Sequence, residues 1–376
     1  MTYSFILGRK HILSTAELFS CIDPSAKIID FMPESCVIAF KKAFENPNES
    51  LNKLGGTIKI VEVFGSLPTE SKSELITAEI TEYIFKNHTD RSTKLNFAIS
   101  LYSFAEKHEQ ILRKILTSTK KKLTEAEIKS RFINKNFKNP HTAAIIGEKL
   151  LRQGMEIVVI KGHDKVFIGK TVAIQDIENY TKRDYERPAR DAKTGMLPPK
   201  LAQIMINLGG LTKIDHDQEE THAVQHTLYD PFCGIGTILS EGLLLGYNVI
   251  GSDLSQDALQ KAQKNIQWTR QQYPYIKTKD RIFQRDAALI NSQNLPEKID
   301  LVITESYLGP PLSKFPPPEL ISKNFAYVRR LVLAFFKAIY PILRSGATVV
   351  ISLPAYRRAD RLFFMEDIPE DIEKLG

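Results

Sequence analysis

Cysteine and tryptophan are scarce in this chain of 376 residues, and no apolar run is long enough to span a membrane. The three cysteines, Cys21, Cys36 and Cys233, are too few and too scattered for a disulfide framework or a zinc site. The sequence therefore predicts a reducing, cytoplasmic environment, no metal centre and no membrane partner. The apolar run within the first ten residues is too short for a signal peptide and predicts a first strand instead.

Acidic residues are outnumbered by basic ones, and the formal net charge is +7. Residues 1–184 carry a net charge of +6, whereas residues 185–376 carry only +1. Within the first part, residues 105–140 hold ten Lys and Arg against four Asp and Glu. This basic cluster predicts contacts with a phosphate backbone, and a solvated helix face is the alternative interpretation.

The chain is organised around a glycine turn at residues 230–237. Asp230 follows a short apolar strand at 227–229, and Gly234 and Gly236 then give a turn without Cβ atoms, which a ligand can approach closely. A helix follows, with Thr237 as its expected cap, and the next strand ends at Asp253. Strand, glycine turn, helix, strand and acid together predict the nucleotide-binding half of a doubly wound sheet.

The run D-P-F-C-G-x-G-T at 230–237 resembles the S-adenosylmethionine (SAM) loop of class I methyltransferases that act on nucleic acid. The resemblance implies that Asp253 accepts from the ribose hydroxyls, and that Asp286 with Ala287, after a third strand, lies at the adenine. The alternative is a tight turn in an unrelated α/β protein. The expected cofactor-binding residues are Pro199, Asp230, Phe232, Gly234, Gly236, Thr237, Asp253, Leu254, Asp286 and Ala287.

A fourth strand at 300–304 leads into Glu305, Ser306 and Tyr307, where amino-group methyltransferases carry D/N-P-P-Y/F. In that motif the side-chain oxygen and the next backbone carbonyl accept the hydrogens of an exocyclic amine, and the aromatic ring stacks on the flipped base. Here Glu305 replaces Asp, Ser306 replaces the first proline, and Tyr307 comes one residue early. A one-residue deletion gives Tyr307 the stacking role, whereas an ungapped alignment gives it to Leu308. We expect Glu305, Ser306 and Tyr307 to be catalytic.

Two further stretches extend the resemblance. R-D-x-K-x-G-M-L-P-P-K-L-A at 190–202 resembles the segment before the SAM loop in THUMP-containing tRNA guanine-N2 methyltransferases, where it packs beside the methionine end of the cofactor. Residues 139–151 and 169–176 resemble the THUMP module, which binds RNA. A capped amphipathic helix alone would explain 201–206 but explains 195–200 less well.

The length and a hydrophobic content of 43% predict two or three globular domains in a mixed α/β chain. We expect a ferredoxin-like α+β domain at 1–66, a THUMP RNA-binding domain at 67–178, a linker without helical period at 179–190, and a Rossmann-like class I methyltransferase domain at 191–376. That last sheet is expected to stop before its final strands, with a weak strand at 361–365. Expected helices in the first part include 15–21 capped by Ser14, separate helices at 106–118 and 124–129, and one helix after Pro140.

The resemblance implies a SAM-dependent tRNA (guanine(10)-N2)-methyltransferase, with tRNA held through backbone contacts from the basic cluster at 105–140. Three alternatives stay open: a methyltransferase for another RNA such as rRNA, a catalytically impaired RNA-binding adaptor, and a methyltransferase for a small molecule or protein. The sequence does not decide the target nucleotide, mono- against dimethylation, a small helper subunit, the oligomeric state, or whether the chain is a fragment.

Overall fold

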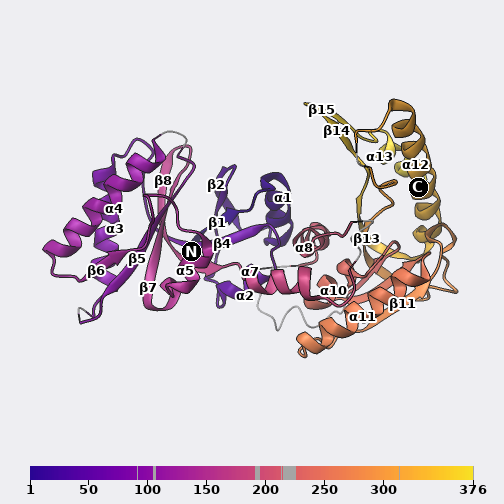
Figure 1. Ribbon diagram of the computed structural model, residues 1–376, viewed down its shortest axis with the longest axis horizontal. Coiled ribbons are helices and arrows are strands. Elements are labelled where there is room, and N and C mark those ends of the chain that lie inside the picture. Colours follow the sequence, from indigo (N-terminus) through magenta and orange to yellow (C-terminus); the bar gives the residue numbers. More distant parts are fainter. Residues whose placement is uncertain are drawn as a thin grey trace. The chain divides into compact units, whose positions relative to one another are not determined.

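The computed structural model describes residues 1–90, 92–104, 107–190, 195–212, 214, 226–312 and 314–375. The chain divides into two compact units, Met1–Asp176 and Ile177–Gly376 (Figure 1). None of the helices formed by the described residues is both long and apolar enough to cross a bilayer.

The first unit is built on one eight-stranded sheet with the order β2-β3-β1-β4-β8-β7-β5-β6. Its strands are β1 (Thr2–Leu7), β2 (Lys27–Met32), β3 (Ser35–Ala39), β4 (Thr57–Pro68), β5 (Leu95–Tyr102), β6 (Ser130–Phe132), β7 (Gly154–Lys161) and β8 (Lys165–Ile174). The long strand β4 pairs antiparallel with β1 on one side and with β8 on the other. The predicted ferredoxin-like and THUMP regions therefore share a single continuous sheet.

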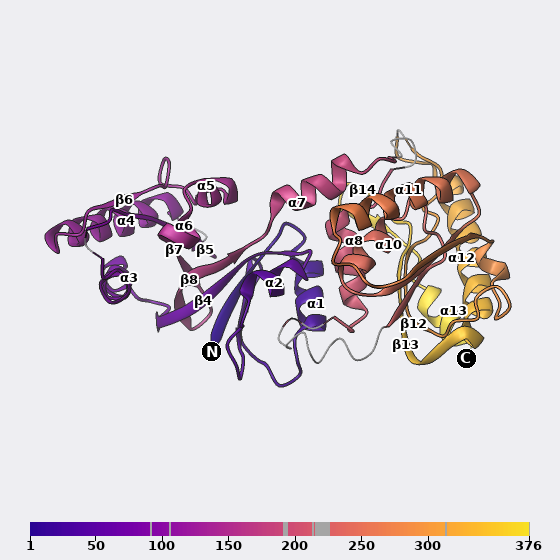
Figure 2. The same cartoon turned by 90° about the horizontal axis from the view of Figure 1, so that it is seen from below.

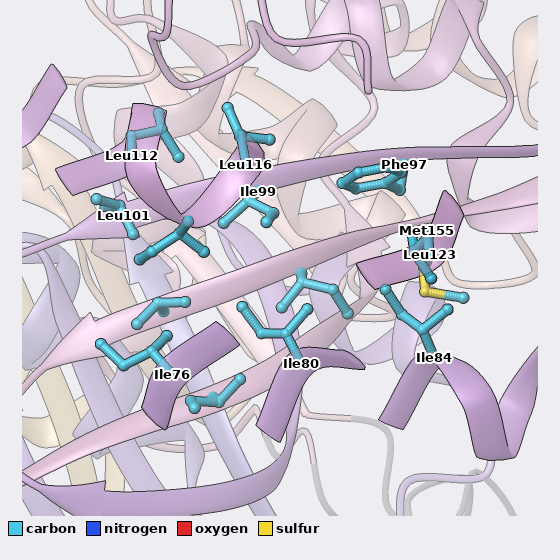
Figure 3. Packing of buried hydrophobic residues seen from close by; sticks show 14 of the residues in the cluster. Ile76, Ile80, Ile84, Phe97, Ile99, Leu101, Leu112, Leu116, Leu123 and Met155 are labelled. Carbon is cyan, nitrogen blue, oxygen red and sulfur yellow. The ribbon is translucent and has the colours of Figure 1, made fainter. Parts of the chain in front are cut away.

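Six helices accompany this sheet: α1 (His11–Cys21), α2 (Pro47–Asn52), α3 (Ser73–Asn87), α4 (His108–Glu125), α5 (Thr142–Gly147) and α6 (Leu150–Gln153). A large core forms where α3 and α4 pack on β5 and β7, because each helix places apolar residues at spacings of three or four on one face. Figure 3 shows this core, with labelled side chains that include Ile76, Ile80, Ile84, Phe97, Ile99, Leu112 and Leu116.

Three helix predictions in this unit are corrected by the structure. Helix α1 begins at His11, so Ser14 is a buried residue inside the helix rather than its cap. The helix predicted at 106–118 continues to Glu125 as α4, since Leu112, Leu116 and Leu123 keep one buried face across the lysine run. The separate helix predicted at 124–129 is wrong, because the chain turns at Ala126 and is not helical over 126–129. The single helix predicted after Pro140 is divided into α5 and α6, because Lys149 adopts a left-handed conformation with φ of 51°.

A buried ion pair links β4 to β7 within the first unit. Lys59 Nζ lies 2.6 Å from Glu156 Oε1, and both side chains are almost fully buried. Ser100 and Thr171 also donate hydrogen bonds to the Glu156 carboxylate, at 2.6 and 2.7 Å. Burial alone would lower the pKa of Lys59, but the charges and hydrogen bonds of Glu156 and Tyr102 together more than offset it, and the pKa is raised. Since a buried charge is costly without its partner, this network holds the two predicted N-terminal regions together.

The second unit is a parallel sheet with the order β11-β10-β9-β12-β13. Its strands are β9 (Thr227–Asp230), β10 (Asn248–Asp253), β11 (Asp280–Gln284), β12 (Ile299–Glu305) and β13 (Leu343–Ser352). Its helices include α8 (Pro199–Leu208), α10 (Thr237–Leu244), α11 (Gln256–Gln272), α12 (Pro318–Ile339), α13 (Ile368–Glu373) and the short η2 (Ala287–Leu289) and η3 (Tyr340–Ile342). Helices α8, α10 and α11 share one core with the sheet and α12 shares another with its opposite face (Figure 2). This is a doubly wound arrangement.

Two segments at the borders of the second unit differ from the sequence prediction or refine it. The sequence predicts a linker without helical period at 179–190, but this segment holds the end of α7 (Ile177–Thr181) and a π-helical turn, η1 (Lys182–Glu186). These turns form because their side chains are anchored: Arg183 Nε donates to Glu241 Oε1 at 2.8 Å, and Tyr180 donates to Gln203. The weak strand predicted at 361–365 is β15 (Arg361–Phe363), which pairs with β14 (Tyr356–Arg358) in a hairpin separate from the parallel sheet.

Candidate cofactor and active site

Acidic side chains gather at the carboxyl edge of the parallel sheet. Strands β9, β10 and β12 end in Asp230, Asp253 and Glu305, and Asp286 follows β11 after one residue. The connections on the two sides of β9 cover opposite faces of the sheet, because α10 and α11 pack on one face and α12 on the other. In open parallel sheets a crevice for ligands forms at this reversal.

The two glycines of the turn after β9 serve different purposes. Gly234 has φ of 50°, and a Cβ atom added there would meet nothing within 4 Å, so the backbone is open to a ligand. Gly236 has φ of 82°, and its added Cβ would lie 3.2 Å from Ala262 Cβ of α11. The second glycine therefore allows the close packing of α10 and α11. Gly236 is also the N-cap of α10, so the expectation that Thr237 caps this helix is wrong.

Asp253 connects the loops after the first two strands. Its Oδ2 accepts from the Gly234 amide and its Oδ1 from the Ser255 amide, each at 2.9 Å. A carboxylate has about four acceptor sites, so capacity remains for two hydroxyl donors. The adjacent Leu254 exposes most of its side chain. The carboxylate is thus fixed in orientation at the edge of the turn.

Asp230 is only 1% exposed and lies under the glycine turn. Its Oδ1 accepts from Thr304 Oγ1 of β12 at 2.7 Å and from the Phe232 amide at 3.1 Å. Burial raises the pKa of Asp230 to about 7, and the charges of Asp253 and Glu305 act in the same direction. The Phe232 ring packs edge-on against Phe335 of α12 at 6.2 Å. Asp230 therefore links β9 to β12 through Thr304, and it holds the start of the turn through the Phe232 amide.

The loop after β11 completes the edge on the side of β10. The Arg285 amide donates to the backbone oxygen of Asp253 at 3.1 Å, which ties this loop to the one carrying Asp253. Asp286 starts η2 by accepting from the Ala288 amide at 2.9 Å. Ala287 is buried in the core beneath the sheet edge. One carboxylate oxygen of Asp286 therefore accepts a hydrogen bond within its own loop. Asp286 follows β11, the strand beside β10, which ends in Asp253.

The end of β12 gives its three expected catalytic residues different surroundings. Glu305 is half-buried, and burial raises its pKa. Ser306 donates to the Ser352 carbonyl of β13 through both its amide, at 3.1 Å, and its hydroxyl, at 2.9 Å. The Ser306 hydroxyl thus donates its hydrogen to β13, and the group of Ser306 that is left to accept from a substrate is its backbone carbonyl.

Tyr307 and Leu308, the two candidates for the stacking position, are both partly exposed, at 43% and 41%. The Tyr307 ring meets Tyr327 of α12 edge-on, with centroids 5.6 Å apart. Gly309 has φ of 100°, and a Cβ atom there would come within 2.6 Å of the Asn324 amide nitrogen. The loop is therefore held close to α12, and either residue has an exposed side chain to present to a base.

A buried arginine that sequence reasoning assigned to the linker lies at the start of α10. Arg187 is 6% exposed, and its Nη1 donates to Thr237 Oγ1 at 2.6 Å. Its Nη2 lies 3.4 Å from Met196 Sδ, and its Nε has no partner among the residues that the structure describes. A small cavity there is also lined by Pro199, the first residue of α8. Asp184, at 3.9 Å, is the carboxylate paired with this guanidinium.

One group of residues from the sequence analysis lies outside the described part of the chain. It is the stretch 191–194 of the motif at 190–202, which includes Asp191 and Lys193. Leu197 and Pro199 of that motif are buried beside α10, in keeping with a segment that packs against the glycine turn.

Comparison with known protein families matches residues 187–306 to the RMKL-like methyltransferase domain. The tRNA (guanine(10)-N2)-dimethyltransferase of Methanothermobacter thermautotrophicus is 26% identical over 197 residues, which cover 52% of this chain and 49% of the relative. The enzyme of the same name from Methanocaldococcus jannaschii is 27% identical over 184 residues, 44% of this chain and 47% of the relative. The chain spans about half the length of these curated relatives.

Solved structures resemble the chain over almost its whole length. TrmN from Thermus thermophilus has a TM-score of 0.51 at 14% identity and covers 96% of this chain and 97% of its own. A predicted N6-adenine-specific DNA methylase from Listeria monocytogenes has a TM-score of 0.51 at 12% identity, covering 99% and 90%. At these identities the likeness establishes the fold, and the second unit has the fold of class I methyltransferases.

Proposed function

We propose that this chain, which carries an RMKL-like methyltransferase domain at residues 187–306, is a SAM-dependent tRNA methyltransferase that modifies the exocyclic amine of a guanosine. The observation that carries the proposal is the open glycine turn whose Gly234 amide is bound to the Asp253 carboxylate, with Glu305 at the same sheet edge. Similarity to two tRNA (guanine(10)-N2)-dimethyltransferases supports guanosine 10 as the target.

The residues present fit SAM on two structural grounds. The open face of Gly234 leaves room for the ligand, and the buried Arg187, whose Nε has no partner among the described residues, offers a donor to an anion near the first turn of α10. Asp253 would hold the ribose, Asp286 and Ala287 the adenine, and Arg187 the carboxylate of the methionine part. When bound, SAM supplies a methyl group that its sulfonium makes electrophilic.

The chain's own groups at the end of β12 would orient the amine. The Glu305 carboxylate and the Ser306 backbone carbonyl accept its two hydrogens, which directs the nitrogen lone pair toward the crevice. An exposed ring at Tyr307 stacks on a base that has left its helix. Accepting groups rather than a strong general base suffice, because the amine gives up its proton only after it has gained the methyl group.

The first unit is proposed to hold tRNA as a THUMP-type module. Several basic side chains of the 105–140 cluster form salt bridges within the protein. Lys121 pairs with Glu125, Lys138 with Glu109, and Arg131 with Glu148. Exposed Lys107, Lys114 and Lys135 are left to meet a phosphate backbone. The proposal also includes a small helper subunit as a second partner, and a cytoplasmic location for the protein.

The test is methyl transfer from labelled SAM to bulk tRNA, followed by mass spectrometry of the nucleosides. We expect N2-methylated guanosine at position ten. Transfer only to rRNA fragments would identify another RNA substrate. SAM binding without transfer to any RNA would refute the enzymatic proposal in favour of an adaptor.

Replacing Asp253 with alanine should weaken SAM binding about 30-fold, or about 2 kcal/mol. The substitution removes the hydroxyl acceptor and also releases the Gly234 amide that shapes the turn. Calorimetric titration measures the effect, and the control is Asp257→Ala, an exposed acid on α11. Equal affinities for the two variants would show that the ribose is held elsewhere.

Replacing Arg187 with methionine should weaken binding of S-adenosylhomocysteine about tenfold, in proportion to one lost charge-assisted contact. The variant should bind 5′-methylthioadenosine, which lacks the carboxylate, as tightly as the unmodified chain does. Arg190→Met, at an exposed guanidinium stacked on Tyr185, is the matched control. If both ligands weakened equally, Arg187 would be a support for the fold and not a carboxylate ligand.

A further inference from the structure

Positive charge is concentrated immediately after the proposed catalytic residues. Residues 307–365 hold nine Lys and Arg against two Asp and Glu, although residues 185–376 as a whole carry a net charge of only +1. This segment comprises the loop after β12, helix α12, strand β13 and the β14–β15 hairpin. Figure 1 shows the hairpin beside one end of α12. The excess is thus concentrated in one stretch of the sequence of the second unit.

The hairpin is fixed to the loop that carries the catalytic residues. Asn324 of α12 donates to the Leu308 carbonyl at 3.3 Å and to the Tyr356 hydroxyl of β14 at 2.6 Å. Phe315 of the loop packs against Phe363 of β15, with ring centroids 5.9 Å apart. These contacts place β14–β15 next to the residues that follow Glu305.

The surface is formed by Lys323, Tyr327, Arg330, Arg357, Arg358 and Arg361, and we call it the hairpin surface. All six side chains are exposed, and the first three lie at positions i, i+4 and i+7 on one side of α12. None of its five cations has an ion pair within the described residues. By contrast, Arg329 of α12, next to Arg330 in the sequence, is paired with Asp371.

Aromatic rings are interleaved with these cations. The Arg358 guanidinium lies 5.5 Å from the centre of the Phe315 ring, and that of Arg361 lies 4.8 Å from the Phe363 ring. Tyr327 is exposed and meets Tyr307 edge-on. Unpaired guanidinium groups are suited to phosphate oxygens, and exposed rings are suited to unstacked bases. A surface that bound an acidic protein would need the cations but not the rings.

We infer that the hairpin surface binds the unpaired RNA strand on either side of the target nucleotide. This inference rests on the proposed function, because it assumes that a base is drawn out of an RNA helix into the crevice. A strand from which one base is drawn out must bend its backbone toward the enzyme, and cations beside the crevice offset the repulsion between its phosphates. The second unit then has its own RNA contacts, in addition to those proposed for the first unit.

The test compares two variants of the full chain, R357Q/R358Q/R361Q and the control K264Q/K277Q/K279Q. The control removes three exposed lysines of the same unit, on α11 and beside β11. Binding of tRNA is measured over a range of salt concentrations. Each phosphate contact to a single strand contributes about 0.7 to the slope of log K against log salt, so the hairpin variant should lose about 2 from that slope. Its KM for tRNA should rise, while its affinity for SAM should not change.

The salt slope separates failure of this inference from failure of the proposed function. If the slope of the hairpin variant equals that of the control, the inference is overturned, and an acidic protein becomes the expected partner of the surface. If the slope falls but the unmodified chain transfers no methyl group to any RNA, the hairpin surface binds RNA but the proposed function fails, and with it the placement of the surface beside a target nucleotide. A thermal melt followed by the fluorescence of Trp268, the single tryptophan, confirms that each variant is folded.

Discussion

Replacing Glu305 with alanine should lower kcat for tRNA methylation by about 10²–10³, the usual cost of removing one preorganised group that faces charge developing in the transition state. Glu305 ends β12 at the crevice, and its carboxylate is the proposed acceptor for one amine hydrogen. The affinity for SAM should be unchanged, because none of the expected cofactor contacts comes from β12. Single-turnover transfer of a labelled methyl group, measured at saturating SAM, gives the rate.

Two further variants decide what a loss of rate means. Glu305→Asp should retain most of the activity, because it keeps the acceptor and restores the residue that the amino-methyltransferase motif carries. Glu319→Ala, at an exposed acid in the first turn of α12, should behave like the unmodified chain. Full activity in Glu305→Ala would remove Glu305 from the reaction and leave the amine to backbone carbonyls alone. Since burial raises the pKa of Glu305, the rate should also begin to fall at a higher pH on acidification than an exposed glutamate would cause.

The parts of this site that the sequence predicted are those fixed by local chemistry. The glycine turn could be identified because Gly234 and Gly236 need positive φ, and a strand before and a helix after leave few alternatives. Asp253 could be identified because it ends the next strand, and the ends of parallel strands share one edge. Both requirements are visible within about 25 consecutive residues.

Arg187 could not be predicted in this way, because its role depends on burial by distant elements. In the sequence it belongs to a charged stretch that resembles a linker. In the structure Thr237 of α10 and Met196 surround its guanidinium, and Ala189 nearby exchanges hydrogen bonds with Asn265 of α11 at 3.0 Å. The only trace in the sequence was an arginine followed by proline shortly before the motif at 190–202.

The hairpin surface was hidden for a different reason. Averaging charge over residues 185–376 cancelled the basic segment at 307–365 against the acidic end of the chain and the acids of the site itself. Sequence distance also separated Leu308 from Tyr356, which Asn324 brings together. Conversely, the basic cluster at 105–140 looked uniform in the sequence, and the structure shows several of its charges paired internally.

Asp230 shows how the requirements of the site oppose those of stability. The carboxylate is buried, and the charges of Asp253 and Glu305 act on it. One of its two oxygens, Oδ1, accepts hydrogen bonds from both the Thr304 hydroxyl and the Phe232 amide. An asparagine would keep that oxygen and both hydrogen bonds, and it would remove the buried charge. Because burial raises the pKa of Asp230 from 3.8 to about 7, the folded protein holds a proton that the unfolded chain gives up between these values.

Asp230→Asn should therefore become more stable relative to the unmodified chain as the pH rises. The stability contributed by protonated Asp230 is fully present below about pH 4 and is lost as the pH rises through about 7, at about 1.4 kcal/mol per pH unit. The difference in free energy of unfolding between variant and unmodified chain should shift by about 4 kcal/mol in favour of the variant between pH 4 and pH 8. Urea unfolding followed by Trp268 fluorescence measures it, since this single tryptophan lies on α11 and reports on the second unit.

The comparison has an internal check in the neighbouring charges. Asp257→Asn, at an exposed carboxylate of the same unit, should show no such shift relative to the unmodified chain. Glu305→Gln should move the transition of Asp230 to lower pH, because the Glu305 charge helps to raise the pKa of Asp230. A difference between Asp230→Asn and the unmodified chain that stays constant from pH 4 to pH 8 would mean that Asp230 is ionised in the folded protein throughout. The carboxylate would then have a solvated path to the crevice, and Asp230 would belong among the residues that contact the ligand directly.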